Sequence, residues 1–107
     1  MARLTPTAQD NVLTLVEAVL TAPGQSTTPT AFSGRFNVSL WGAFEGTAVL
    51  ERSFNGGSSW IPCASLGQPV VFDRPFSETI FSSEEGILYR VRVLTLTSGA
   101  IQARLSQ

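Results

Sequence analysis

The sequence contains no histidine, no lysine and only one cysteine, Cys63. Without histidine the chain cannot build a Ser-His-Asp or Cys-His nucleophilic site or a histidine-based metal site. A single cysteine cannot close an internal disulfide, which excludes a small secreted domain held together by disulfides, and we expect Cys63 to be a small buried residue. Asp10 and Asp73 are the only aspartates, which is too few for a calcium cage. We therefore expect a protein that is not an enzyme and that needs no cofactor and no metal.

Charge of either sign is also scarce. The formal net charge is −1 over 107 residues, and all seven basic residues are arginine. With no basic patch in the sequence, we expect no nucleic-acid partner. No apolar run reaches the roughly 20 residues that a membrane helix needs, and the first ten residues lack the apolar run of a signal peptide. We therefore expect a protein made in the cytoplasm, with no membrane partner.

Alternation of apolar and polar residues predicts β-strands through most of the chain. The pattern is clearest in residues 35–41, where Phe36, Val38 and Leu40 face one side and Trp41 faces the other. The other predicted strands span residues 47–54, a short run from 60, 70–72, 76–81, 87–97 and 100–105. Turn residues separate the strands at intervals of roughly 8 to 12 residues, a spacing typical of sandwiches. We predict an all-β, single-domain β-sandwich or jelly roll of about seven or eight antiparallel strands.

The N-terminal region is organised differently. Residues 1–10 are polar and rich in threonine, and we predict an extended arm there, flexible or docked on a partner, followed by a sandwich domain over residues 11–107. Residues 11–21 are ambiguous. Their apolar residues fit a helical stripe with Asp10 as N-cap, whereas their β-branched residues fit a strand. We favour the strand.

The stretch from Phe36 to Trp60 reads FNVSLWGAFEGTAVLERSFNGGSSW, and its punctuation by glycine predicts a meander of three strands. Its last eight residues, SFNGGSSW, resemble the Asp-box, the S-x-D-x-G-x-[ST]-W hairpin of sialidase propellers and other β proteins. Asparagine stands here where that motif has aspartate. In those families the box is a folding device with no catalytic role. The resemblance implies that four residues stabilise the turn, with the tryptophan packed over it: Ser53, Asn55, Gly57 and Trp60.

Two outward-facing sets of side chains are candidate binding surfaces. One contains Trp41. The other lies on the strand 87–97, where Arg90 and Arg92 alternate with apolar residues. Leu94 and Leu96 would lie on the same side as these arginines, and a face of arginine and leucine has the mixed composition of a protein interface. A β-bulge in this strand would instead return the leucines to the core. A carbohydrate-binding module, with Trp41 and Tyr89 stacked on sugar rings, is an alternative reading of the same aromatic residues.

The run FNVSLWGAFEGTAVLERSFNGGSSWIP, with the tail GILYRVRVLTLTSGAIQARLSQ, resembles a group of small virion proteins of tailed bacteriophages. They share the pattern G-x-F-N-V-S-[ILV]-W-G-x-F-x-G-x-[AV]-x-L-x-R-S-F-D-G-G-x-x-W. The resemblance implies a capsid decoration, or cement, protein with a β-sandwich or jelly-roll fold, made in the bacterial host cytoplasm and placed on the virion capsid surface. A tail or neck accessory protein is the alternative among phage proteins.

The resemblance also implies partners. A decoration protein binds the major capsid protein and stabilises its lattice, and we expect a homo-oligomer, a trimer rather than a dimer. The residues expected to contact partners come from the arm and from the two outward-facing sets: Arg3, Leu4, Trp41, Arg90 and Arg92.

Overall fold

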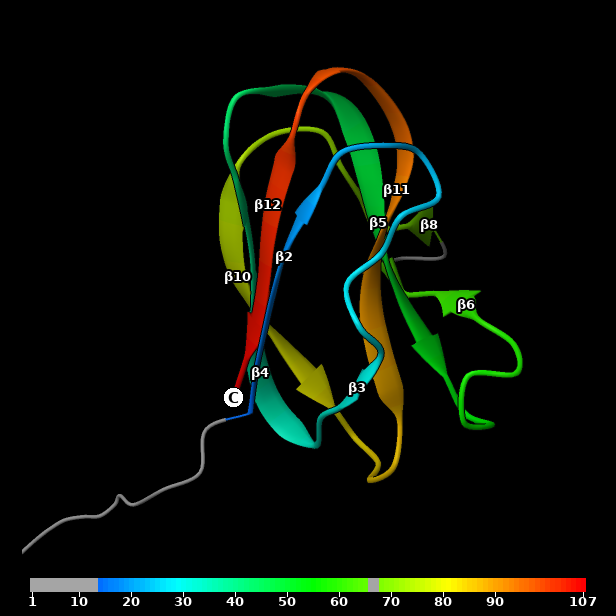
Figure 1. The fold of residues 1–107 in the computed structure, drawn as a ribbon. Coiled ribbons are helices and arrows are strands. Elements are labelled where there is room, and N and C mark those ends of the chain that lie inside the picture. Colours follow the sequence, from blue (N-terminus) through cyan, green and yellow to red (C-terminus); the bar gives the residue numbers. More distant parts are fainter. Residues whose placement is uncertain (1–13, 66–67) are drawn as a thin grey trace, which may run out of the picture.

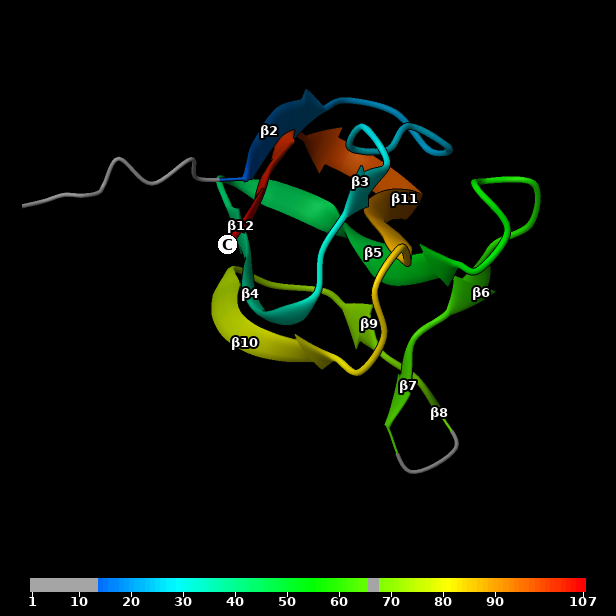
Figure 2. The same ribbon diagram turned by 90° about the horizontal axis from the view of Figure 1, so that it is seen from below.

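The computed structural model describes residues 14–65 and 68–107, which form two antiparallel sheets packed as a sandwich (Figures 1 and 2). The four-stranded sheet has the spatial order β10 (Phe76–Ser82), β4 (Gly34–Trp41), β12 (Ile101–Ser106) and β2 (Leu15–Leu20). The five-stranded sheet has the order β3 (Thr30–Ala31), β11 (Leu88–Gly99), β5 (Phe44–Ser53) and β6 (Ile61–Pro62), and β9 (Val71–Phe72) also pairs with β5. A small hairpin joins β7 (Ala64–Ser65) and β8 (Gln68–Pro69). The predicted all-β sandwich is confirmed.

From β4 onward, each long strand lies in the sheet opposite to the long strand before it. β4 pairs with β10 and β12, whereas β5 pairs with β11, β6 and β9. The predicted three-strand meander is therefore wrong at its first step, because the chain leaves one sheet for the other at Gly42. The φ of Gly42 is +109°, and a Cβ there would lie 2.9 Å from the carbonyl oxygen of Ala100. The second step, a hairpin between β5 and β6, is confirmed by the pairing of Arg52 with Ile61.

The two sheets are joined by an aromatic stack in the core. Phe36 of β4 lies 4.7 Å from Tyr89 of β11, measured between ring centroids, and 4.6 Å from Phe32. Each of these rings is almost completely buried. Aromatic pairs at this spacing add to the free energy gained from burying their area. The rest of the buried apolar core comes from both sheets: Leu20, Val38, Leu40, Ala48, Leu50, Ile87, Val91, Val93, Ile101, Ala103 and Leu105.

The ambiguous segment near the N-terminus contains a strand. β2 covers Leu15–Leu20 and pairs with β12, with Leu20 opposite Ile101. Its exposure alternates with a period of two, since Leu20 is buried while Val19 is 60 % exposed. The favoured reading is confirmed over this range and the helix is wrong there. Residues 11–13, and the predicted arm over residues 1–10 with Arg3 and Leu4, lie outside the described residues.

A β-bulge interrupts the pairing of β11 with β5. The register shifts between Val93 and Thr95, and Leu96 packs against the buried core. The predicted arginine–leucine face is therefore wrong for Leu96, and the bulge is the reason. Gly46 lies opposite Leu96, and a Cβ on Gly46 would be 2.3 Å from the carbonyl oxygen of Thr95. The absence of a side chain at position 46 allows the bulged strand to approach β5.

This close approach makes Gly46→Ala a sharp test of the bulge. We expect the substitution to lower the free energy of unfolding by about 3 kcal/mol, because the added methyl group meets backbone that cannot rotate away. Gly86→Ala is the matched control. Position 86 has a φ of +80° but no atom within 4 Å of an added Cβ, so its cost is about 1 kcal/mol. Urea unfolding of both variants gives the comparison, and equal losses would contradict the close approach.

Candidate functional site

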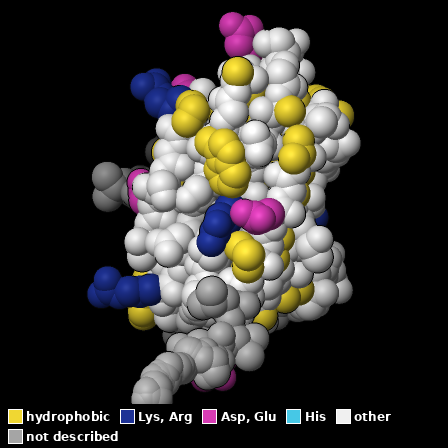
Figure 3. Space-filling view, turned by 60° about the vertical axis from the view of Figure 1, so that its left-hand side comes forward, with side chains coloured by type: hydrophobic (Ala, Val, Ile, Leu, Met, Phe, Trp, Pro, Cys, Tyr) yellow, Lys and Arg dark blue, Asp and Glu magenta, His cyan; other side chains and the backbone are white. Residues whose placement is uncertain are grey.

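The outer face of the four-stranded sheet carries several exposed large apolar side chains. Trp41 is 38 % exposed and lies in one row with Gln102 of β12 and Val19 of β2. Since neighbouring strands are about 4.8 Å apart, Trp41 and Val19 are separated by roughly 10 Å. Leu15 and Phe81 are also exposed on this sheet. In Figure 3, hydrophobic side chains lie above and below a neighbouring basic and acidic pair on this side of the molecule.

The polar groups on the same face are largely paired with one another. The hydroxyls of Ser39 and Ser77 are 2.7 Å apart, and Thr79 donates a 3.0 Å hydrogen bond to the side-chain oxygen of Asn37. Arg104 forms an ion pair with Glu17 across β12 and β2, with 3.5 Å between nitrogen and oxygen. These side chains satisfy each other within the sheet. The exposed apolar side chains, which include Trp41, Val19, Leu15 and Phe81, remain as the groups with most contact area to gain from a partner.

The outer face of the five-stranded sheet is organised around Glu51. Its side chain is 5 % exposed. Arg90 donates to it at 2.9 Å, and Arg92 donates through two nitrogens at 3.0 Å. The guanidinium of Arg90 also lies 4.1 Å from the ring centroid of Trp60. Both arginines predicted to bind a partner thus contact groups of their own chain. Their side chains remain 21 % and 33 % exposed, and partner binding through them stays a prediction.

The ionisation of Glu51 reflects two opposing effects. Burial raises the pKa of its carboxyl group, but the hydrogen bonds from Arg92 and Arg90, with their positive charges, outweigh burial and hold the pKa below its ordinary value. In return, the hydrogen bond to Glu51 raises the pKa of Arg92. The Glu51 carboxylate therefore stays ionised at neutral pH, and its one negative charge lies between the two arginine side chains. The sequence analysis missed Glu51, because only the pairing of β5 with β11 brings it between the two arginines.

The hairpin from Ser53 to Trp60 has the hydrogen bonds expected of an Asp-box-like turn. The side-chain oxygen of Asn55 accepts from the hydroxyl of Ser53 at 2.9 Å and from the backbone N–H of Ser59 at 3.0 Å. The Ser53 hydroxyl oxygen in turn accepts from the backbone N–H of Gly57 at 2.9 Å. Asparagine therefore folds this turn through the same acceptor atom that aspartate would supply.

Trp60 closes this turn on its outer side. A Cβ built on Gly57 would lie 3.8 Å from the Trp60 ring, so the indole packs against the turn as predicted. Tyr89 is only 2 % exposed, because it belongs to the core stack. The reading in which Tyr89 stacks on a sugar is therefore wrong, whereas Trp41 remains exposed.

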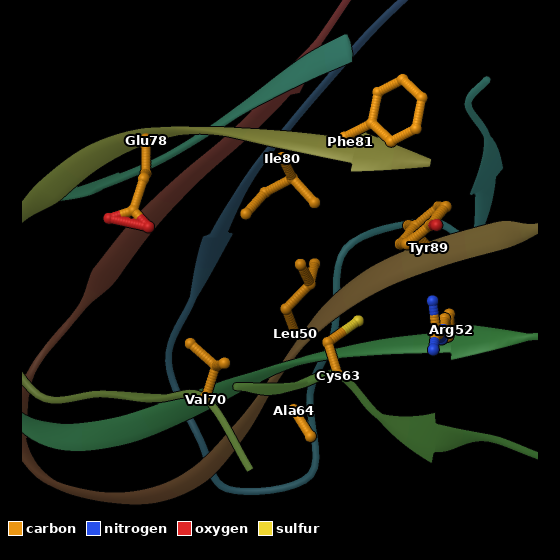
Figure 4. Close-up of a pocket in the computed structure, with 9 residues that line it drawn as sticks. All are labelled: Leu50, Arg52, Cys63, Ala64, Val70, Glu78, Ile80, Phe81 and Tyr89. Atoms are coloured by element: carbon orange, nitrogen blue, oxygen red, sulfur yellow. The ribbon is translucent and has the colours of Figure 1, made fainter. Parts of the chain in front are cut away.

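A cavity of about 270 Å³ lies between the edge strand β10 and the β5 side of the other sheet (Figure 4). Leu50 and Ile80 line it from opposite sheets, and Arg52, Cys63 and Glu78 line it as well. Burial raises the pKa of the Cys63 thiol; the charge of Arg52 partly offsets this effect and that of Glu51 adds to it. Sequence reasoning missed the cavity, because its residues come from segments that no local pattern brings together.

In residues 14–65 and 68–107, no group of three or more His, Cys, Asp or Glu side chains could hold a metal ion. That same part of the chain contains no helix of the length and apolarity needed to cross a membrane. No protein-family model, curated protein or solved structure matches the sequence or its fold.

The Glu51 cluster predicts how stability depends on pH. The folded-state pKa of this carboxyl is lowered, so its stabilisation is complete above the unfolded-state pKa of about 4.3 and is lost as pH falls through the folded-state value. We expect acidification to lower the free energy of unfolding of the parent protein more than that of Glu51→Gln, measured by urea unfolding at several pH values.

Glu17→Gln provides the matched control for this comparison. Its ion pair with Arg104 is about half exposed, at 53 % and 45 %, and such surface pairs contribute little to stability. The control should follow the parent protein closely across the acid range. Parallel curves for the parent and Glu51→Gln would contradict the assignment.

The turn predicts a difference between two substitutions of Asn55. Asn55→Ala removes the acceptor for Ser53 and Ser59, and we expect it to lower the free energy of unfolding by about 1 to 2 kcal/mol. Asn55→Asp keeps that acceptor. The Ser59 hydroxyl oxygen accepts from the Asn55 amide at 2.8 Å, and in the variant this hydroxyl can instead donate to the new carboxylate, so a change within about 0.5 kcal/mol is expected. Thermal and urea unfolding measure the stability of both variants. A large loss for Asn55→Asp would show that the amide N–H group is what the turn requires.

Proposed function

We propose that the chain is a non-enzymatic structural protein of a tailed-phage virion, of the capsid decoration type. On this proposal it binds the major capsid protein through the outer face of the four-stranded sheet and stabilises the capsid lattice from outside. The proposal rests on the resemblance of the sequence to small phage virion proteins together with the position of Trp41.

The outward position of Trp41 is the observation that carries the proposal. In the stretch that resembles phage proteins, Phe36, Val38 and Leu40 are buried, and the hairpin residues fold a turn. These residues are explained by the fold alone. Trp41 alternates with them, points to the other side of β4 and keeps 38 % of its surface exposed. Tryptophan is among the residues that contribute most to protein interfaces when a partner covers them.

The size of this face supports attachment at several points. Four strands about 4.8 Å apart, each presenting about six residues with a rise of about 3.3 Å, give a face of roughly 20 by 20 Å, or about 400 Å² in projection. A stable interface typically buries about 800 Å² on each partner. One such face is therefore a weak binder by itself. A homo-oligomer, for which we favour a trimer, would present several copies of this face to a repeating lattice. The combined weak contacts would then hold the oligomer firmly on the capsid.

Two other functions fit parts of the same surface. A tail or neck accessory protein would use the Trp41 face on a different virion partner. A carbohydrate-binding module would use Trp41 together with the hydroxyl and amide groups beside it, and such groups recur on this face at Ser39, Ser77 and Thr79. Their mutual hydrogen bonds leave them less free to recognise a sugar, which favours a protein partner.

The test is co-sedimentation of the protein with expanded capsids assembled from the major capsid protein encoded nearest to it. We expect the parent protein to bind and to raise the melting temperature of the capsid. Trp41→Ala should weaken binding by about 30-fold, since truncating a central tryptophan typically costs at least about 2 kcal/mol.

Ile61→Ala is the matched control. Ile61 is 50 % exposed but lies on β6 of the other sheet, so its loss should leave capsid binding unchanged. If the parent protein neither binds capsids nor stabilises them, the decoration function is wrong. If both variants bind like the parent, the Trp41 face is not the attachment site. Loss of binding to a glycan array in Trp41→Ala would favour the carbohydrate reading instead.

A further inference from the structure

The cavity beside Cys63 has an apolar interior and charged groups at its boundary. In Figure 4 the side chains of Leu50 and Ile80 approach each other from opposite sheets, and the Cys63 side chain lies beside Leu50 at the wall of the cavity. Arg52 and Glu78 line the same cavity at separate positions, one from β5 and one from β10. Phe81 also lines the cavity, although its ring lies on the other side of β10 from Ile80.

Arg52 is the group in this cavity that lacks a partner. Its Nε is buried and makes no hydrogen bond within the described part of the chain. Among the residues that the structure describes it also forms no ion pair, in contrast to Arg90 and Arg92. The guanidinium lies 5.3 Å from the ring centroid of Phe54, a contact that holds it in place. A buried donor without an acceptor is costly, and native proteins satisfy nearly all such groups.

We propose that this cavity binds a small monocarboxylate with a short apolar body. The carboxylate would accept hydrogen bonds from Arg52, whose forked guanidinium matches the geometry of a carboxylate. The apolar body would lie against Leu50, Ile80 and Val70. Glu78 repels a second negative charge, so a ligand with one carboxylate is preferred over a diacid.

The volume of the cavity limits the size of the ligand. A space of about 270 Å³ is larger than the roughly 150 Å³ apolar cavity that can take up a benzene molecule, so it has room for an acid of about six carbons. This binding site is separate from the Trp41 face, since it lies between the sheets. The inference therefore does not depend on the capsid function, and either can fail without the other.

Cys63 provides the readout, because it is the only cysteine of the chain and lines the cavity. The rate at which the neutral reagent iodoacetamide alkylates the thiol is measured against ligand concentration. Four probes share a six-carbon skeleton and differ in charge: hexanoate, hexanol, hexylammonium and adipate. We expect hexanoate to protect Cys63 at concentrations about tenfold lower than hexanol, with hexylammonium and adipate weaker still.

Two variants test the roles of the charged groups. Arg52→Gln should abolish the preference for hexanoate over hexanol, while Glu78→Gln, at an exposed position on β10, should reduce the discrimination against adipate. If Arg52→Gln fails to fold, the probe series on the parent protein and on Glu78→Gln still decides the matter.

Three results would overturn the proposal. Equal protection by hexanoate and hexanol would mean that Arg52 takes no part and that water satisfies its buried nitrogen. Stronger protection by hexylammonium would assign the cavity to a cation held by Glu78. No protection by any probe, with the parent protein folded, would mean that the cavity is not a binding site for compounds of this size.

Discussion

The contact between Phe36 and Tyr89 across the sandwich is the constraint on which the rest of the structure depends. It fixes which side of β4 and which side of β11 face inward. Because successive side chains of a strand alternate, Trp41 and Arg90 must then lie on the two outer faces. The same contact buries Tyr89, which removes an apparent ligand-binding residue from the surface. The surfaces available to a partner are therefore formed by the side chains that the core does not bury.

The two outer faces differ in how their polar groups are satisfied. On the five-stranded sheet, one buried carboxylate organises two arginines, and Trp60 lies over one of them. On the four-stranded sheet the polar side chains bond to each other in rows and leave Trp41, Val19 and Leu15 exposed. On the five-stranded sheet, the charged groups of the Glu51 cluster are thus satisfied by other groups of the same chain. The four-stranded sheet has apolar area that a partner can cover, which is why the proposed attachment is assigned to the Trp41 face.

Local patterns in the sequence predict local features well here. Alternation correctly separates Phe36 from Trp41, and the residues from Ser53 to Trp60 form their turn through bonds between near neighbours. Features that depend on distant pairing could not be read in the same way. The meander failed because β4 and β5 join different sheets. Leu96 does not join the predicted arginine–leucine face because one bulged residue reverses the alternation. Glu51 and the cavity beside Arg52 are likewise products of strand pairing, with no signal in any single segment.

The two ends of the described sandwich meet beside each other. The backbone N–H of Gln107 donates to the carbonyl oxygen of Thr14 at 2.9 Å, and its side-chain amide contacts the carbonyl oxygens of Ser33 and Arg35. The same pairing of strands could therefore be kept with a different order of the strands along the chain. A short peptide from Gln107 to Thr14, with a new opening in the exposed turn at residues 83–86, would give a circular permutant that keeps every strand pair. The new termini would lie at the same end of the sandwich as Gln107, because Ser82 pairs with Gly34 and Gln107 contacts Ser33 and Arg35. The chain could therefore begin and end in a different loop without rebuilding the core.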